Sequence, residues 1–182
     1  MPRYVLTGAP GSGKTALLRL LERAGHAVVE EAATDVIALE HALGEPDPSA
    51  RPEFADRVVA LQRQRQLSAP PGSMTVFFDR SPVCTLALAR FLGRPVSALL
   101  AAELERVTRE AIYARAVFFV RNQGFVTRTA ARRISFADSL AFEKVHEQAY
   151  RELGFELIEV PAAPLTDRAA LVCRATGSLT SG

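Results

Sequence analysis

The chain has 182 residues, 48% of them hydrophobic, and a formal net charge of +2. This describes one ordinary globular domain that can bury roughly 70% of its unfolded surface, so its stability requires neither a metal nor a disulfide. No apolar run is long enough to span a bilayer, and the first predicted strand leaves no room for a signal peptide, so we expect a cytoplasmic protein without membrane contacts. The arginines are scattered along predicted helices without interleaved aromatic residues, so we do not expect a nucleic-acid partner.

Short apolar runs alternate along the chain with segments of helical periodicity. The runs 75–78 and 117–120 are apolar at every position except Thr75, which indicates strands buried on both faces and therefore a parallel sheet between two helix layers. The intervening turns are too short to be linkers, so a single α/β domain over residues 1–182 is predicted. The predicted strands are 3–7, 27–30, 74–79, 116–120 and 155–160, and the predicted helices are 14–24, 32–43, 52–69, 82–92, 95–113, 139–153 and 166–175.

The segment between the first strand and the first helix matches the phosphate-binding loop pattern G-x-x-x-x-G-K-[ST]. Glycines let the backbone aim successive N–H groups at one anion, and the helix that follows adds its positive N-terminal end. We expect Lys14 to act on the β and γ phosphates in binding and catalysis, and Thr15 to ligate a phosphate-bound Mg²⁺. The expected nucleotide-binding residues are Gly8, Ala9, Pro10, Gly11, Ser12, Gly13, Lys14, Thr15 and Ala16.

Two carboxylates, Glu30 and Glu31, end the second predicted strand. We expect Glu31 to accept the proton of an attacking substrate hydroxyl or to orient that hydroxyl by a hydrogen bond. The alternative is that both carboxylates stabilise the N-terminus of the following helix. For Glu30 this alternative is favoured, because strand alternation predicts that it lies on the opposite side.

Asp79 ends the third predicted strand and is followed by Arg80 and Ser81. Ligands gather at the carboxyl ends of parallel strands, so we expect Asp79 to face the phosphates and to hold Mg²⁺ through a coordinated water, together with Thr15. The alternative role for Asp79 is to cap the helix that begins at Pro82. Ser81 fits that capping position better.

A basic segment follows the fourth predicted strand. Its residues Arg128 and Arg132 are four apart, so they leave one face if the segment is helical. We expect both to be catalytic residues of a mobile lid at about 121–139 that neutralises the transferring phosphoryl group and excludes water. A solvated basic face is the alternative. Arg121 and Arg133 are weaker candidates for the same role.

The cysteines and histidines do not match the spacing of a metal site. Cys84 and Cys173 are expected to be small core residues in a reducing compartment. His26, His41 and His146 are interpreted as surface or helix-end residues.

Taken together, the segments 7–15, 28–33, 77–82 and 135–161 resemble the single-domain P-loop proteins grouped with the AAA domain of the NadR type, over nearly the whole chain. The resemblance implies a P-loop NTPase three-layer sandwich with a five-stranded parallel sheet of order 2-3-1-4-5, and ATP as the phosphate donor. That family is related to nucleoside kinases and includes the ribosylnicotinamide kinase domain. The triplet at 79–81 is also similar to a motif of deoxynucleoside kinases, which implies that Arg80 and Glu31 bind the acceptor at its 5′ hydroxyl end.

The sequence thus predicts an ATP- and Mg²⁺-dependent kinase of a small hydroxyl-bearing metabolite such as a nucleoside or ribosyl compound. The alternative is an ATP-binding or slowly hydrolysing switch that transfers nothing. A kinase needs a carboxylate to orient the acceptor and a switch does not, so Glu31 and Arg80 favour the kinase. ATP is favoured over GTP because the N-K-x-D pattern that reads guanine is missing from the sequence.

Overall fold

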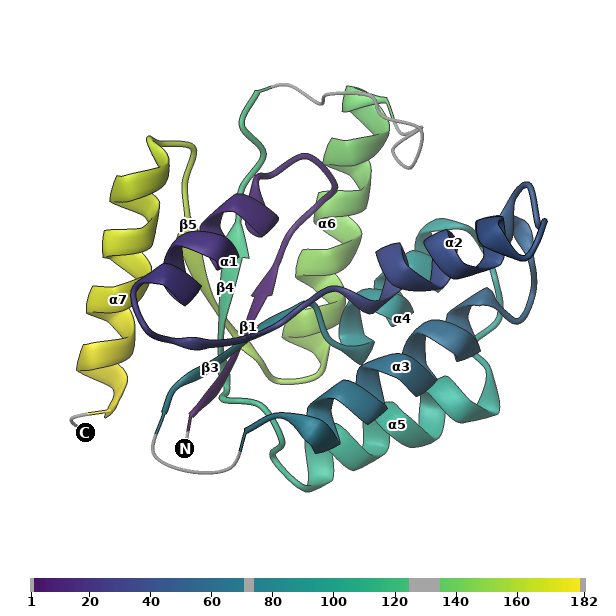
Figure 1. Cartoon of the computed structure of the whole chain (residues 1–182), viewed down its shortest axis with the longest axis horizontal. Coiled ribbons are helices and arrows are strands. Elements are labelled where there is room, and N and C mark those ends of the chain that lie inside the picture. Colours follow the sequence, from purple (N-terminus) through teal and green to yellow (C-terminus); the bar gives the residue numbers. More distant parts are fainter. Residues whose placement is uncertain (1, 71–73, 125–134, 181–182) are drawn as a thin grey trace.

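A computed structural model describes residues 2–70, 74–124 and 135–180 (Figure 1). Its single described sheet has five strands in the order β2-β3-β1-β4-β5, and every neighbouring pair is parallel. The predicted three-layer architecture and the strand order that the resemblance implied are both confirmed. The strands are β1 (Arg3–Thr7), β2 (Ala27–Val29), β3 (Val76–Asp79), β4 (Ala116–Val120) and β5 (Glu156–Val160).

Alternate strand residues enter two separate cores. Tyr4 and Leu6 of β1 are buried with α1 (Lys14–Arg23) and α7 (Leu165–Thr180), whereas Val5 is buried on the opposite face. That face is covered by α3 (Phe54–Ser68), α4 (Pro82–Phe91), α5 (Ala98–Arg109) and α6 (Phe136–Glu152). Burial on both faces explains why these strands read as continuous apolar runs. Figure 1 shows α1 and α7 lying together on one side of the sheet.

A smaller core lies beyond the sheet, where α2 (Ala32–Ala42) packs on α3 through Val36, Phe54 and Val58. A short 3₁₀ helix, Pro48–Ala50, joins these two helices. None of the helices in the described ranges is both long enough and apolar enough to cross a bilayer.

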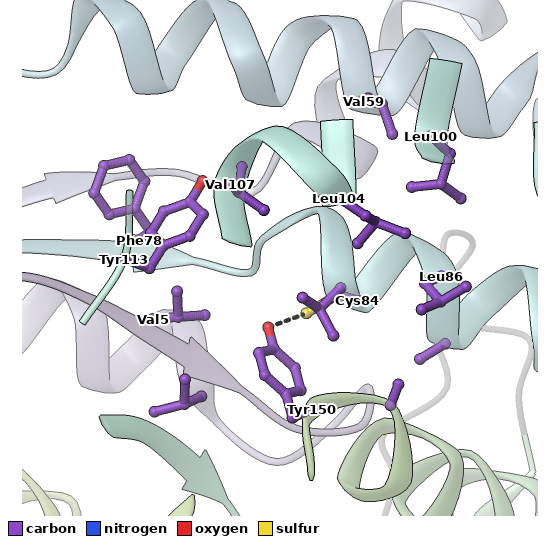
Figure 2. Packing of buried hydrophobic residues seen from close by; sticks show 14 of the residues in the cluster. Val5, Val59, Phe78, Cys84, Leu86, Leu100, Leu104, Val107, Tyr113 and Tyr150 are labelled. Atoms are coloured by element: carbon purple, nitrogen blue, oxygen red, sulfur yellow. Dashed lines mark hydrogen bonds between the residues drawn. The ribbon is translucent and has the colours of Figure 1, made fainter. Parts of the chain in front are cut away.

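The core that contains Val5 also includes a polar contact close to the end of β3. Figure 2 shows the hydroxyl of Tyr150 pointing at the Cys84 sulfur, with 3.1 Å between the two atoms. The same hydroxyl lies 2.7 Å from Ser81 Oγ. Cys84 is buried, as predicted for a small core residue, whereas Cys173 is only half-buried.

The observed elements differ from the predicted ones mainly at their ends. β2 ends at Val29, one residue early, and α5 is shorter at both ends than the predicted 95–113. α6 begins at Phe136 because the Ser135 hydroxyl accepts a hydrogen bond from the Asp138 N–H at 3.0 Å and caps the helix. Residues 136–139 of the predicted lid therefore belong to the first turn of α6.

Candidate functional site

The candidate site lies at the carboxyl ends of three neighbouring strands. The phosphate-binding loop follows β1, Glu31 follows β2, and Asp79 ends β3. Together with α1 and α2 they line a cavity of about 640 Å³. Of the residues predicted from sequence, those lining this cavity are Pro10, Gly11, Gly13, Lys14, Thr15, Ala16, Glu31, Asp79 and Arg80.

The loop backbone depends on glycine at particular positions. Gly8 has φ +136°, and a Cβ atom there would lie 2.2 Å from the Val120 carbonyl oxygen of β4. Gly11 and Gly13 also have positive φ angles. A side chain at Gly8 is therefore excluded both by its backbone conformation and by the strand beside it.

Lys14 is folded onto this loop. Its Nζ donates hydrogen bonds to the carbonyl oxygens of Gly8 at 2.9 Å and Ala9 at 3.1 Å, and to Ser12 Oγ at 3.3 Å. Burial and the nearby charge of Arg80 lower the pKa of Lys14 to about 8, although neighbouring carboxylates oppose the shift. The amine is thus positioned by the loop itself and is poorly compensated by negative charge.

Asp79 is 5% exposed, and its Oδ1 atom is buried without a hydrogen-bond partner among the described residues. Burial raises the pKa of Asp79, while the charge of Lys14 opposes the change. Strand pairing sets Asp79 beside Leu6, close to where β1 enters the phosphate loop. A buried acceptor without a partner is costly unless something else satisfies it, which fits a coordinated water or cation.

Ser81, and not Asp79, caps α4. The Ser81 hydroxyl accepts a hydrogen bond from the Val83 N–H at 3.3 Å. The capping alternative for Asp79 is therefore wrong, and this carboxylate is available to the cavity.

Glu31 and Arg80 form an ion pair across the cavity wall, with 2.5 Å between Glu31 Oε1 and Arg80 Nε. Thr34 Oγ1 also donates a hydrogen bond to Glu31 Oε2 at 3.1 Å. Burial raises the pKa of Glu31, but the charges of Arg80 and Lys14 more than offset it, so the net shift is downward. Glu31 occupies the N-cap position of α2, yet its side chain forms no capping hydrogen bond.

The prediction for Glu30 is wrong. Strand alternation predicted that Glu30 would lie on the opposite side from Glu31, whereas both residues line the same cavity. The physical reason is that β2 ends at Val29, so the alternation has stopped before Glu30. Its carboxylate pairs with Arg19 of α1 at an exposed position.

His146 corrects a second expectation, because it is fully buried and not a surface residue. Its Nδ1 lies 3.0 Å from the Phe142 carbonyl oxygen and its Nε2 lies 3.3 Å from Arg80 Nη1. Burial and the charge of Arg80 lower the pKa of His146 well below its usual value. A neutral ring that donates from Nδ1 to the carbonyl therefore accepts from Arg80 at Nε2. The spacing of Phe142, His146 and Tyr150 along one helix face was the available sequence signal.

Arg65 of α3 is a second residue that sequence reasoning missed. Its Nη1 donates to the carbonyl oxygens of Glu30 at 3.0 Å and Glu31 at 2.9 Å, and its Nη2 pairs with Asp35. Arg65 thus fixes the backbone that carries Glu31. A contact between residues 34 positions apart leaves no local pattern to detect.

The predicted lid residues Arg128, Arg132 and Arg133 lie outside the described residues, so their roles stay predictions. Arg121 is among the described residues, but it does not line the cavity and is paired with carboxylates. Its Nη1 donates to Glu143 at 3.0 Å and Glu147 at 3.1 Å, and its guanidinium also pairs with Glu159. Arg121 therefore joins β4 to α6 and β5.

The sequence matches a family model described as an AAA domain over residues 3–168. A comparison with curated protein sequences finds no significant match. The fold is similar to that of deoxyadenosine kinase from M. mycoides with bound dCTP, with TM-score 0.65 and 12% identity over 98% of this chain and 100% of that chain.

The fold is also similar to that of a NadR protein in complex with NR, with TM-score 0.68 and 19% identity over 97% of this chain and 51% of that chain. A NadR protein in complex with NAD and AMP-PNP gives TM-score 0.66 and 18% identity, over 97% and 49% of the two chains. The chain thus spans about half of the NadR chains that it resembles. At these identities the likeness shows a shared fold.

Proposed function

The chain belongs to the AAA domain family that matches residues 3–168, and from this premise we propose that it is an ATP- and Mg²⁺-dependent phosphotransferase acting on a small hydroxyl-bearing metabolite. The observation that carries the proposal is the Glu31–Arg80 ion pair, which faces the same cavity as Lys14 and Asp79. A site that only binds or hydrolyses nucleotide requires the last two residues but not the pair.

The donor side of the proposed reaction is the phosphate loop. Lys14 contributes a positive charge where the loop N–H groups and the start of α1 converge, and this favours binding of the β and γ phosphates. The fold shared with a NadR protein in complex with AMP-PNP supports ATP as the donor.

Thr15 and Asp79 are the residues that would hold Mg²⁺, Thr15 by its hydroxyl and Asp79 through a coordinated water. The buried and unpartnered Oδ1 of Asp79 fits such a ligand set. When bound, the ion would neutralise charge on the phosphate oxygens.

On the acceptor side, Glu31 orients the attacking hydroxyl. The charges around it keep its carboxylate ionised, so it serves better as a hydrogen-bond acceptor than as a strong base. Arg80 fixes the Glu31 carboxylate and lines the same cavity. In the transfer, the acceptor oxygen forms a bond to the γ phosphorus, the bond from that phosphorus to the β–γ bridging oxygen breaks, and ADP leaves. The hydroxyl proton passes to the Glu31 carboxylate late in this step and from there to solvent. Arg128 and Arg132 are proposed to close over this group.

The proposed acceptor is a neutral nucleoside or ribosyl compound. Among the described residues, the two arginines that line the cavity already have carboxylate partners, because Arg80 is paired with Glu31 and Arg19 is paired with Glu22 and Glu30. A phosphate ester would require cations that are not already neutralised. The fold shared with a deoxyadenosine kinase and with a NadR protein in complex with NR supports the same class.

The proposal is tested by incubating the protein with ATP, Mg²⁺ and one acceptor at a time, including deoxyadenosine, cytidine and nicotinamide riboside. Phosphorus NMR and ADP release are followed together. We expect at least one acceptor to become a monophosphate and to accelerate ADP release. Slow ADP release that no acceptor changes, with no phosphorylated product, would instead support the switch.

A further inference from the structure

A buried arginine lies against the phosphate loop from the side of α7. The Nη2 atom of Arg168 donates a hydrogen bond to the Ser12 carbonyl oxygen at 2.7 Å. A Cβ atom added to Gly13 would lie 3.0 Å from Arg168 Nη1, so the glycine before Lys14 also makes room for this guanidinium. Only 4% of Arg168 is exposed.

The positive charge of Arg168 has no ionic partner among the acidic side chains of the protein. All 20 Asp and Glu residues of the sequence lie in the described ranges, and none of them forms an ion pair with Arg168. Its Nε atom is buried without a hydrogen-bond partner within the described part of the chain. Arg168 also lies in the first turn of α7, where the helix dipole is positive.

A buried cation without a counter-charge destabilises a fold, because burial removes the water that would otherwise solvate it. Burial accordingly lowers the pKa of Arg168. A neutral side chain at this position would fill the space without burying a charge. Structure alone therefore does not explain an arginine here, whereas an anion bound in the adjacent loop would supply the missing counter-charge.

We propose that Arg168 is a positioning residue of the nucleotide site: it fixes the Ser12 carbonyl, and its unpaired charge strengthens binding of the nucleotide polyphosphate in the loop. It contacts the loop backbone at Ser12 and is not one of the residues that line the cavity, so it acts through the loop. This inference rests on the nucleotide binding in the proposed function, but it does not depend on any acceptor.

A structural role and this electrostatic role differ in how the loss of affinity depends on the charge of the nucleotide. If Arg168 only supports the fold, Arg168→Gln lowers the melting temperature of the unliganded protein and weakens the binding of AMP and ATP equally. If its charge serves the nucleotide, the same substitution weakens nucleotide binding in proportion to the charge of the ligand. A charge effect must also grow with the number of phosphates, so the loss of affinity should increase from AMP to ADP to ATP.

The experiment measures the dissociation constants of AMP, ADP and ATP by calorimetry on the full chain, together with melting temperatures without nucleotide. For Arg168→Gln we expect ATP affinity to fall about tenfold or more, with a smaller loss for AMP. Arg168→Lys, which keeps the charge, should retain most of the affinity. Arg23→Gln removes the same charge from an exposed position of α1 and should bind ATP as the wild type does.

Wild-type ATP affinity in Arg168→Gln would overturn the inference. A loss that is equal for AMP and ATP, accompanied by a lower melting temperature without nucleotide, would overturn it in favour of a structural role. Failure of the wild-type protein to bind ATP would overturn nucleotide binding itself. If the nucleotide affinities are as expected but no acceptor is phosphorylated, only the proposed kinase activity is contradicted.

Discussion

At the scale of single residues, some charged groups of the site form ion pairs with other side chains and others do not. Glu31 is paired with Arg80, whereas Lys14 is hydrogen-bonded mainly to neutral carbonyl groups and Asp79 keeps one oxygen without a described partner. The uncompensated groups surround the phosphate loop, and the paired groups line the acceptor part of the cavity. This division is what a reaction between an anionic donor and a neutral acceptor requires.

The first prediction concerns the pH dependence of nucleotide binding. The pKa of Lys14 is lowered to about 8 in the unliganded protein, and a bound polyphosphate raises it by adding negative charge. Affinity for ATP should therefore be complete below that pH and decrease as the pH rises above it, with proton uptake on binding in the same range. Calorimetry in buffers of different ionisation enthalpy measures both. An affinity that stays constant between about pH 7 and pH 9.5 would contradict this assignment.

The second prediction separates the metal from the nucleotide. Asp79→Asn keeps the size of the side chain but removes the charge that would hold a metal-bound water. We expect the Mg²⁺ concentration needed for half-maximal ADP formation to rise and the rate at saturation to fall. Nucleotide affinity measured without Mg²⁺ should change much less. An unaltered Mg²⁺ titration would remove Asp79 from the metal site.

At the scale of elements, α6 connects the parts of the site. One face of this helix contacts the phosphate loop through Ser139, whose hydroxyl donates to the Pro10 carbonyl at 3.2 Å. Farther along, His146 contacts Arg80 and Tyr150 contacts Ser81. The helix whose first turn includes the end of the predicted lid thus contacts both the donor loop and the turn that carries Arg80.

The third prediction tests the contact between α6 and Arg80. In His146→Leu the leucine fills the buried space but cannot accept a hydrogen bond from Arg80. The KM for the substrate that receives the phosphate should therefore rise about tenfold or more. ATP affinity should stay near the wild-type value. His146→Gln, which restores an acceptor, should recover part of the loss, and His41→Leu, at the exposed end of α2, should have no effect. Equal losses in the leucine and glutamine variants would reduce His146 to a packing role.

At the scale of the whole molecule, the fold could be read from the sequence because its strands are buried on both faces. Continuous apolar runs such as β3 and β4 are typical of strands covered by helices on both sides, and the loop after β1 fixes the position of the site within the sheet. Element ends were less accurate, since the cap at Ser135 decides where α6 begins. The supporting contacts of Arg65, His146 and Arg168 were missed because each joins residues far apart in the chain.

The central claim is that this molecule transfers phosphate to a hydroxyl oriented by Glu31. The most direct measurement compares acceptor phosphorylation and acceptor-independent ATP hydrolysis in the wild type, in Glu31→Gln and in Glu30→Gln, whose carboxylate pairs with Arg19. We predict that Glu31→Gln reduces phosphorylation roughly 10²-fold or more while hydrolysis persists, because the orienting carboxylate serves only the hydroxyl acceptor. Glu30→Gln should resemble the wild type in both reactions. Equal losses of phosphorylation and hydrolysis in Glu31→Gln, or no loss in either, would contradict the account.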